Sequence, residues 1–503
     1  MRRMPRALLA LVSLVAALAL VAGVSMLQPS GRTTTQPPTA RGPQTEEAGA
    51  PDTENDEAAE QADGIARRRD ALESAIAAGT LVGQHRPAND APAAGWIGEQ
   101  PFEATAPDDW EPAVAADPHA SWVYVVVTRY GVTKPCNGNC PTPYIALRVS
   151  GDGGATFGPS SPLCACKGSG QFDPIIEVVP NTGAVYALYM NGFNVLFTKS
   201  TNHGASWSAP VKTYGNVSWN DKPILAVSDD GKDVYVAFNG PTGGDPWIAQ
   251  SHDSGATWSQ TKVVDSNRYI FAFDGDVAAD GTVYFGESSL LYGGGGNKGT
   301  YPTDAIEEHV FVSTNKGQAW TDKLVASVQP GVACVAAGCT PDYYLAHNAV
   351  SADAAGSVVL LYDGATTTRG LQTIAARRST DRGQTWSAAT TLSASGEEAT
   401  DPAVESTGSG DVRAWYAQTS GGGNVDQWNT WYRQSSDGGA TWSAPVKISD
   451  ASGGAAYKSA AGYQEPYGDY GEMAITSTGR SFAVWGEGTS YDGPGGVWYN
   501  RQP

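Results

Sequence analysis

Residues 110–503 contain short stretches in which hydrophobic and polar positions alternate, with turn residues between them. Alternation with a period of two is typical of β-strands. One repeat reads QFDPIIEVVPNTGAVYALYM, then NVLFTKS, then TNHGASWSAPVKTYG. Each repeat therefore has an inner apolar segment, a short turn, an alternating strand, a variable loop and a third strand. This order predicts a repeating unit of an all-β protein.

A second pattern follows the third strand of the repeats. The motif Ser-x-Asp-x-Gly-x-Thr-Trp, with some substitutions, occurs six times, and its starts are 50 to 66 residues apart. The copies start at Ser150, Ser200, Ser251, Ser313, Ser379 and Ser435. We expect its Asp or Asn to cap a tight turn, its Gly to take a positive φ and its aromatic residue to wedge into neighbouring packing. The spacing is close to one four-stranded propeller blade.

The inner segments number seven, one more than the motifs. They read AVAAD, IIEVVP, ILAVSD, DVAAD, AVSAD, AVEST and EMAITS. The seventh repeat starts near Gly471 and ends before a motif can form, so it supplies only three strands. An open blade edge is costly, and residues 91–106 are the natural donor of the missing strand. We therefore predict a seven-bladed β-propeller from about residue 90 to 503, with six blades as the main alternative.

Strands alternate in direction within a blade, so the motif turn shares a face with the turn between the first two strands. The long loops, at 129–143, 287–308, 326–346 and 449–468, belong to the opposite face, called the front here. Long loops on a rigid scaffold are the usual place for binding and catalysis. The motif is therefore predicted to mark the back of the propeller, with function on the front.

The N-terminus precedes this unit with three different compositions. Residues 1–27 combine basic residues with an apolar run, the pattern of a signal peptide, with an uncleaved membrane anchor as the alternative. Residues 28–63 are rich in Thr, Pro, Ala and Glu, which predicts a disordered linker. Within 64–89, apolar residues predict one short amphipathic helix at 64–78, followed by a connector. The expected location is secreted or extracytoplasmic.

Charge narrows the partners. The 503 residues carry a formal net charge of −20. This argues against nucleic acid as a partner, and membrane association is expected only through an N-terminal anchor. A glycan or glycoprotein is the expected partner.

The six cysteines fit an exported protein, because an even count in an oxidising compartment favours disulfides. Cys334 and Cys339 form the obvious local pair. Three pairings remain open for the other four, and the loop positions would let Cys136 or Cys140 pair across to Cys164 or Cys166. A zinc site built from those four is the alternative.

Polar residues open the inner segments at the front, nearest the predicted axis. In chain order they are Glu111, Asp173, Lys222 with Asp221 beside it, Asp274, His347, Asp401 and Tyr470. One interpretation is that they cap strand ends and hold water or a structural Ca²⁺, although no dedicated calcium loop is present. The other is a carboxylate-lined pocket for acid–base chemistry on a polar substrate, without a cofactor.

The motif and blade pattern resemble the sialidase superfamily, whose propellers carry Asp-box, or bacterial neuraminidase, repeats. The resemblance covers nearly everything from about residue 110 onward. That family uses a Tyr nucleophile helped by a Glu, an Asp acid/base and three arginines that grip the substrate carboxylate. Residues 470–479 read YGEMAITSTG, similar to the family's Tyr-Ser-Asp-Leu-x-x-Leu-x-x-Gly. The resemblance therefore implies Tyr470 as the nucleophile.

The remaining roles follow from the predicted ring. Asp401 and Asp173 are the candidate catalytic carboxylates, since a phenol with a pKa near 10 needs a base to become a nucleophile. Candidate substrate-binding residues are Glu111, Asp221, Asp274, His347, Arg129, Arg268 and Arg369. The family's Phe/Tyr-Arg-Ile-Pro signature is absent before the first motif.

Three functions fit this sequence. The first is an exo-glycosidase of sialidase type that acts on extracellular glycans. The second is a non-catalytic extracellular propeller that binds glycan or protein. The third is another polysaccharide-active propeller, either an inverting glycosidase or a lyase with His347 and Tyr470 as base and acid.

Overall fold

The computed structural model describes part of the chain. The described residues are 54–79, 91–103, 108–132, 134–164, 166–240, 244–291, 301–302, 304–332, 347–420, 428–449, 471–488 and 494–503. The predictions for residues 1–27, for Tyr470 and for the Cys334–Cys339 pair lie outside them.

The described strands form seven four-stranded antiparallel sheets, so the prediction of a seven-bladed β-propeller is confirmed. Blades 1 and 2 consist of β2 (Asp108–Ala116), β3 (Val123–Tyr130), β4 (Tyr144–Ser150) and β5 (Ser161–Pro162), and of β6 (Gln171–Val178), β7 (Val185–Asn191), β8 (Val195–Ser200) and β9 (Val211–Lys212). Blades 3 and 4 consist of β10 (Asp221–Val227), β11 (Val234–Asn239), β12 (Pro246–Ser251) and β13 (Ser259–Lys262), and of β14 (Tyr269–Val277), β15 (Val283–Leu290), β16 (Ile306–Ser313) and β17 (Thr321–Val328).

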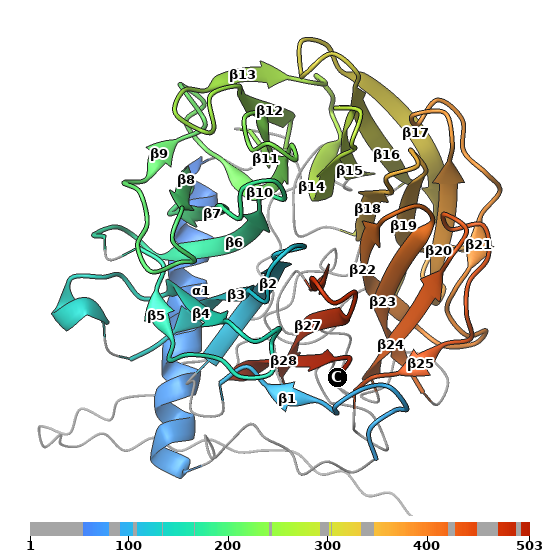
Figure 1. Ribbon diagram of the computed structural model, residues 1–503. Coiled ribbons are helices and arrows are strands. Elements are labelled where there is room, and N and C mark those ends of the chain that lie inside the picture. The colour runs from blue at the N-terminus through green and yellow to red at the C-terminus, as the bar shows by residue number, and fades with distance from the viewer. Residues whose placement is uncertain are drawn as a thin grey trace, which may run out of the picture. The chain divides into compact units, whose positions relative to one another are not determined.

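The other three blades follow the same plan. Blades 5 and 6 consist of β18 (Asn348–Ala352), β19 (Val358–Ala365), β20 (Gln372–Ser379) and β21 (Thr390–Thr391), and of β22 (Ala399–Thr407), β23 (Asp411–Thr419), β24 (Trp428–Ser435) and β25 (Val446–Lys447). Blade 7 consists of β26 (Glu472–Ile475), β27 (Ser481–Gly488), β28 (Gly495–Arg501) and β1 (Gln100–Pro101). In Figure 1 the first strands of successive blades, such as β2, β6, β10 and β14, lie nearest the centre of the ring.

Ring closure uses both ends of the propeller. Gln100 and Pro101 of β1 pair with Tyr499 and Trp498 of β28, so a segment before blade 1 supplies the outermost strand of blade 7. The predicted donor, residues 91–106, is therefore confirmed. Beside it, Phe102 is buried in the apolar cluster that joins blades 7 and 1. Closure thus pairs the edge of β28, which would otherwise be the outer edge of a three-stranded blade 7.

The repeated motif forms turns as the sequence predicts. In the last copy, the Ser435 hydroxyl accepts from the Gly439 N–H at 2.9 Å and donates to Asp437 at 2.7 Å. Asp437 in turn accepts from the backbone N–H and the hydroxyl of Thr441 at 2.8 and 2.6 Å. These bonds, the Thr441 hydroxyl first, lower the pKa of Asp437 to about 2. The motif aspartate therefore caps the turn, because its carboxylate accepts hydrogen bonds from other groups of the same turn.

Each motif turn also packs against the preceding blade. Gly154 and Gly255 have positive φ values of 82° and 80°, and a Cβ there would collide with Phe482 and Phe197 respectively. The aromatic residue that follows does the same, since Trp258 of blade 3 lies edge-on to Phe197 of blade 2 with ring centroids 5.4 Å apart. Glycine is thus required for both the turn and the contact between blades.

The faces are also as predicted. The Gly153 N–H of the first motif turn donates to Ser121 in the turn between β2 and β3, and the Ser254 N–H donates to Lys232 in the corresponding turn of blade 3. The motif turns therefore share one face with the short turns between first and second strands.

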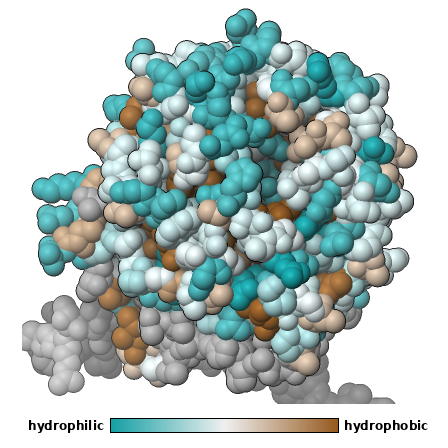
Figure 2. All heavy atoms as spheres, viewed as in Figure 1, coloured by the Kyte–Doolittle hydropathy of each residue, from teal (hydrophilic) through white to brown (hydrophobic). Residues whose placement is uncertain are grey.

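The view in Figure 2 shows mainly hydrophilic residues, with hydrophobic residues only in small separate places.

Helix α1 (Glu54–Ala78) corrects one boundary. The predicted helix at 64–78 is its C-terminal part, and residues 54–63, expected in the disordered linker, are helical. The physical reason lies in the sequence, because Ala, Glu and Gln favour helix and acidic residues near the start complement the helix dipole. Within the described part of the chain, no helix is long and apolar enough to span a membrane.

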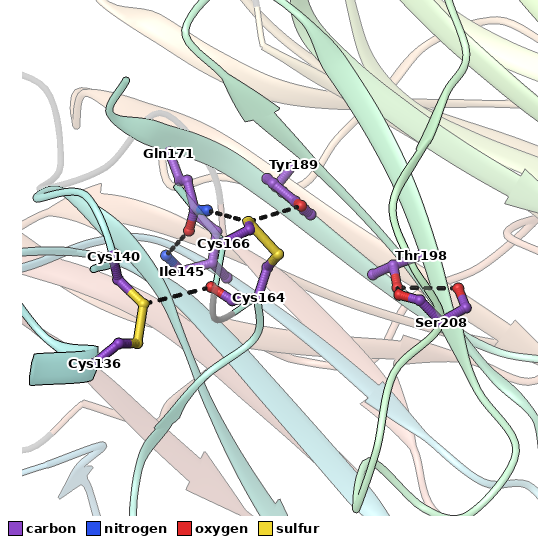
Figure 3. The surroundings of a disulfide bond; sticks show 9 residues. All are labelled: Cys136, Cys140, Ile145, Cys164, Cys166, Gln171, Tyr189, Thr198 and Ser208. Atoms are coloured by element: carbon purple, nitrogen blue, oxygen red, sulfur yellow. Dashed lines mark hydrogen bonds between the residues drawn. A yellow bond between two sulfur atoms is a disulfide. The ribbon is translucent and has the colours of Figure 1, made fainter. Parts of the chain in front are cut away.

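The described cysteines pair locally. Disulfides join Cys136 to Cys140, around the short 3-10 helix η1 (Cys136–Gly138), and Cys164 to Cys166, with Cα–Cα distances of 5.4 and 5.2 Å. Figure 3 shows the two bridges near one another, with the Gln171 amide donating to the Cys166 sulfur at 3.3 Å. Pairing across the two loops was therefore the wrong alternative, and thiolates for the zinc alternative do not exist. The pairs form locally because each loop turns back on itself.

Ring closure can be tested by removing the apolar anchor beside β1. We expect Phe102→Ala to lower the free energy of unfolding by about 3–5 kcal/mol, because it truncates a fully buried aromatic side chain at the junction of blades 7 and 1. Denaturant-induced unfolding, followed by fluorescence, measures the change. Gln100→Ala, at an exposed position on the same segment, is the control. An unfolding midpoint equal to the wild-type value would show that this segment does not hold the ring closed.

Candidate functional site

Four inner strands of the described blades carry the same strained feature at their front ends. Glu111, Asp173, Lys222 and Asp401 have φ values of 54°, 48°, 49° and 50°, in a region that non-glycine residues rarely occupy. Each precedes a proline and lies at a break in the register with the second strand. Strain of this kind persists only where the surroundings enforce it, and it concentrates at functional sites. The recurring x-Pro pair was a sequence signal for these bulges.

The bulges of blades 1 and 2 bring two predicted residues together. The Glu111 carboxylate accepts from the Thr128 hydroxyl at 2.6 Å and from the Asp173 N–H at 2.9 Å. Burial raises the pKa of Asp173 well above its ordinary value; the charges of Glu111 and Asp221 raise it further, whereas that of Lys222 lowers it. Burial and these neighbouring carboxylates therefore favour the protonated form of Asp173. A buried, protonated carboxyl beside a cation is suited to donate that proton.

Sequence reasoning missed a tyrosine in this group. Tyr130 ends β3, and its side chain is 8% exposed. Burial raises its pKa well above 10, and the charges of Glu111 and Asp173 act in the same direction. Its phenol is therefore neutral and lies within electrostatic range of both carboxyls. An aromatic residue at the end of a second strand had no repeat signal to single it out.

A second group lies at the front ends of blades 5 and 6. His347 has its Nδ1 3.4 Å from Asp363 and its Nε2 3.3 Å from Asp401. Asp363 also accepts from the Thr400 hydroxyl at 2.7 Å and is fully buried. A carboxylate on one ring nitrogen holds the imidazole so that the other nitrogen faces Asp401. Of these residues, His347 and Asp401 were predicted, whereas Asp363 on β19 was missed.

The three predicted arginines are not brought together. Arg129 makes two bonds to Asp109, at 2.6 and 2.8 Å, and an ion pair with Glu103 at 2.8 Å. Arg268 donates to the Ser289 hydroxyl and to the carbonyls of residues 289 and 305. The Arg369 guanidinium lies 4.2 Å from the centre of the Tyr301 ring. Each arginine is therefore held within its own part of the ring, by blade 1, blade 4 and the loop after β19.

The other two predicted residues have structural partners. Asp274 accepts from the Val350 N–H at 3.0 Å and so joins β14 to β18. Asp221 is buried at the start of β10, opposite Asn239 of β11, and its charge acts on Asp173.

Behind this front end, the axis contains a cavity of about 500 Å³ that reaches the turns of the motif face. Its walls include His347 and Asp401, and five further carboxylates from four inner strands. They are Glu177, Asp274, Asp276, Glu405 and Glu472. Burial raises the pKa of every one of them, and for Glu177, Glu405 and Glu472 the neighbouring carboxylates raise it further. Mutual repulsion thus favours protonated, neutral forms along the axis.

The described residues contain no group of three or more His, Cys, Asp or Glu side chains arranged to hold a metal ion. The structural Ca²⁺ interpretation therefore has no donor set in this part of the chain. Among the axial carboxylates, Asp274, Asp276 and Glu472 accept hydrogen bonds from backbone N–H groups of neighbouring inner strands.

Comparison with known proteins adds the following. No protein-family model matches the sequence, and a search of curated proteins found no matching sequence. Matched solved structures include an ulvan lyase, a polysaccharide lyase bound to -[GlcA(1-4)Rha3S]-, at 12% identity and a TM-score of 0.48, over 80% of this chain and 95% of that one. The intramolecular trans-sialidase from Ruminococcus gnavus matches at 14% identity and 0.42, over 82% and 98%. A protein of unknown function from Dyadobacter fermentans matches at 12% and 0.45, over 81% and 98%.

The axial carboxylates predict an unusual dependence of stability on pH. Their pKa values are higher in the folded than in the unfolded chain, so the folded state binds more protons. Their stabilising contribution is full below the ordinary glutamate value of 4.5 and is lost as the pH rises through the folded values. We therefore expect the melting temperature to fall between about pH 5 and pH 8.

Two variants separate the axis from the surface. Glu177→Gln should flatten this decline, because the amide cannot ionise. Asp437→Asn should leave it unchanged, because the pKa of Asp437 is lowered to about 2 and its contribution is lost only in strong acid. A melting temperature that rises steadily from pH 5 to neutrality would contradict the prediction.

Proposed function

We propose that this chain is an exported propeller that acts on extracellular glycans through acid–base chemistry at the front end of its axial channel. The carrying observation is the row of strained bulges at Glu111, Asp173, Lys222 and Asp401. Four separate blades hold a charged side chain in the same unfavourable backbone conformation, at the same level of the ring. A purely structural role could use glycine there, which takes a positive φ without strain.

The proposed reaction is glycoside hydrolysis of sialidase type. Asp173 is the general acid: its raised pKa favours the protonated form, it gives its proton to the leaving glycosidic oxygen, and Lys222 then stabilises the new carboxylate. Tyr470 is the nucleophile, and Asp401 is the base that accepts its phenolic proton. Asp401 is the third residue of β22 in blade 6, and in the sequence Tyr470 is two residues before β26 of blade 7, the next blade in ring order.

His347 has a supporting role. Its contacts at 3.4 Å with Asp363 and 3.3 Å with Asp401 hold the ring between two carboxylates. When Asp401 takes the proton from Tyr470, the imidazole remains its hydrogen-bonding partner and fixes its orientation. His347 is therefore a positioning residue in this scheme.

A non-catalytic glycan- or protein-binding propeller is the second candidate, and one observation favours it. Asp173, Glu111, His347 and Asp401 are only 4–6% exposed, and each predicted arginine has partners within the fold. Groups this buried can stabilise the contacts between blades. Binding would then use the front loops, and the charged bulges would only fix the positions of the strand ends that carry these loops.

The assignment of the general acid is tested with Asp173→Asn. We expect this change to lower kcat/KM on fluorogenic glycosides by roughly 10²–10⁴-fold, because the amide cannot donate a carboxyl proton. A sialoside is the first substrate, followed by a panel of other glycosides. Asp437→Asn, on a motif turn, is the matched control and should keep wild-type kinetics. Equal activity of Asp173→Asn and wild type would remove Asp173 from the mechanism.

The nucleophile is tested separately with Tyr470→Phe. The loss of the phenolic oxygen should abolish kcat on the sialoside while the melting temperature stays at its wild-type value. Mass spectrometry of the wild type, trapped with a fluorinated sialoside, should then find the adduct on Tyr470. If the wild type turns over no glycoside yet is retained on a glycan array, the binding propeller is the correct alternative.

A further inference from the structure

Helix α1 places one arginine against the candidate site. Arg68 is 5% exposed, although its neighbours Arg67 and Arg69 are exposed. Its guanidinium lies 3.6 Å from the centre of the Trp110 ring and 4.8 Å from that of Tyr130. Two aromatic faces and a buried cation make a desolvated cation–π site.

A carboxylate completes this pocket. Arg68 Nη1 lies 3.8 Å from Asp108 Oδ2, and the side chain of Asp108 is fully buried. The pocket is therefore built from the first residues of β2 and the last residue of β3. Aromatic rings together with a carboxylate recognise a guanidinium by shape and by charge.

The pocket adjoins the proposed acid. Trp110 directly precedes Glu111, the residue that accepts from the Asp173 N–H. The pKa of Tyr130 depends on the charges of four neighbours, which are Arg68, Glu111, Asp108 and Asp173. The arginine from α1 thus contacts Tyr130, whose phenol is within electrostatic range of Asp173.

Side chains on one face of α1 attach it to the propeller. Besides Arg68, Leu72 is fully buried, and Ile65 packs against the cluster that contains Trp110, Tyr130 and Phe172. Residues 65, 68 and 72 lie on one face of a helix, because spacings of three and four residues return to the same side. Most other described positions of α1 are exposed or partly exposed. In the described side chains, Arg68 therefore lies in the middle of the attached face.

We propose that α1 is an intramolecular cover of the acid–base site, and that its Arg68 occupies a guanidinium-binding pocket formed by Asp108, Trp110 and Tyr130. Release of the helix exposes Glu111, Asp173 and Tyr130 and frees the pocket for a cationic group from outside. The regulatory part of this inference rests on the proposed function, whereas the pocket and the cover do not.

The cover is tested by hydroxyl-radical footprinting of the full chain, with oxidation of Trp110 and Tyr130 measured by mass spectrometry. We expect Arg68→Ala to raise both oxidation rates roughly tenfold, because a desolvated cation–π contact shifts the opening equilibrium by about that factor. Arg69→Ala, an exposed neighbour with the same loss of charge, should match the wild type. Oxidation of Trp485, buried in blade 7, should stay constant in all variants and so excludes global unfolding.

Chemical rescue tests the pocket itself. Ethylguanidinium added to Arg68→Ala should restore protection of Trp110, whereas neutral ethylurea of similar shape should not. Equal oxidation in Arg68→Ala and Arg69→Ala would overturn the cover, and equal protection by the two small molecules would overturn the guanidinium pocket.

Turnover separates this inference from the proposed function. If α1 covers a working site, Arg68→Ala should raise kcat/KM on the glycoside several-fold, and Arg69→Ala should not. A rise in oxidation with no turnover in any variant supports the pocket and the cover while it refutes the acid–base function. A rise in oxidation together with lower turnover overturns the regulatory part, since Arg68 would then assist the reaction.

Discussion

The convergence of seven inner strands on one axis is the constraint on which the rest of the structure depends. Each strand must place its side chains toward a shared, narrow space, and carboxylates there can neither spread apart nor reach bulk water freely. Burial and mutual repulsion therefore raise the pKa of Glu177, Glu405 and Glu472, and backbone N–H groups of neighbouring inner strands cap others, as Val350 does for Asp274. The same polar contacts that neutralise the axis also join blade to blade.

The buried carboxylates have different surroundings at the two ends of the axis. Toward the motif face, the carboxylates line a cavity, and burial and mutual repulsion favour their protonated forms. At the front, Glu111, Asp173 and Asp401 lie at positive-φ bulges. Glu111 accepts from a hydroxyl and from the Asp173 N–H, and Asp401 contacts an imidazole. Directed contacts of this kind set the orientation and the protonation state of single groups, which is what catalysis requires. The front end is therefore the better candidate for chemistry, although the axial cavity lies behind it.

The repeats made the fold predictable. The site was hard to predict because several of its residues lie at positions that no repeated pattern marks. Motif copies recur 50 to 66 residues apart and inner segments recur with them, so the blade number and a closing strand within residues 91–106 followed from counting. Asp363 and Tyr130 occupy second strands, where no repeated signal marks a polar residue as special. Arg68 comes from outside the repeats altogether, and its position depends on a tertiary contact of α1. The three candidate substrate-binding arginines do not converge. Each contacts groups of its own part of the ring, because nearby carboxylates, carbonyls or aromatic rings already bind its guanidinium.

Burial at the front end has two opposite consequences. Burial and the nearby Glu111 raise the pKa of Asp173, so exposure of the site to water would lower that pKa and weaken the hold of Asp173 on its proton. A substrate, however, cannot reach a carboxyl that is 4% exposed. A removable cover reconciles the two requirements if the entering substrate replaces the helix and excludes water in its place. On this view the attachment of α1 through Arg68 is functional: a broad apolar contact would protect the proton equally well but would never release the site.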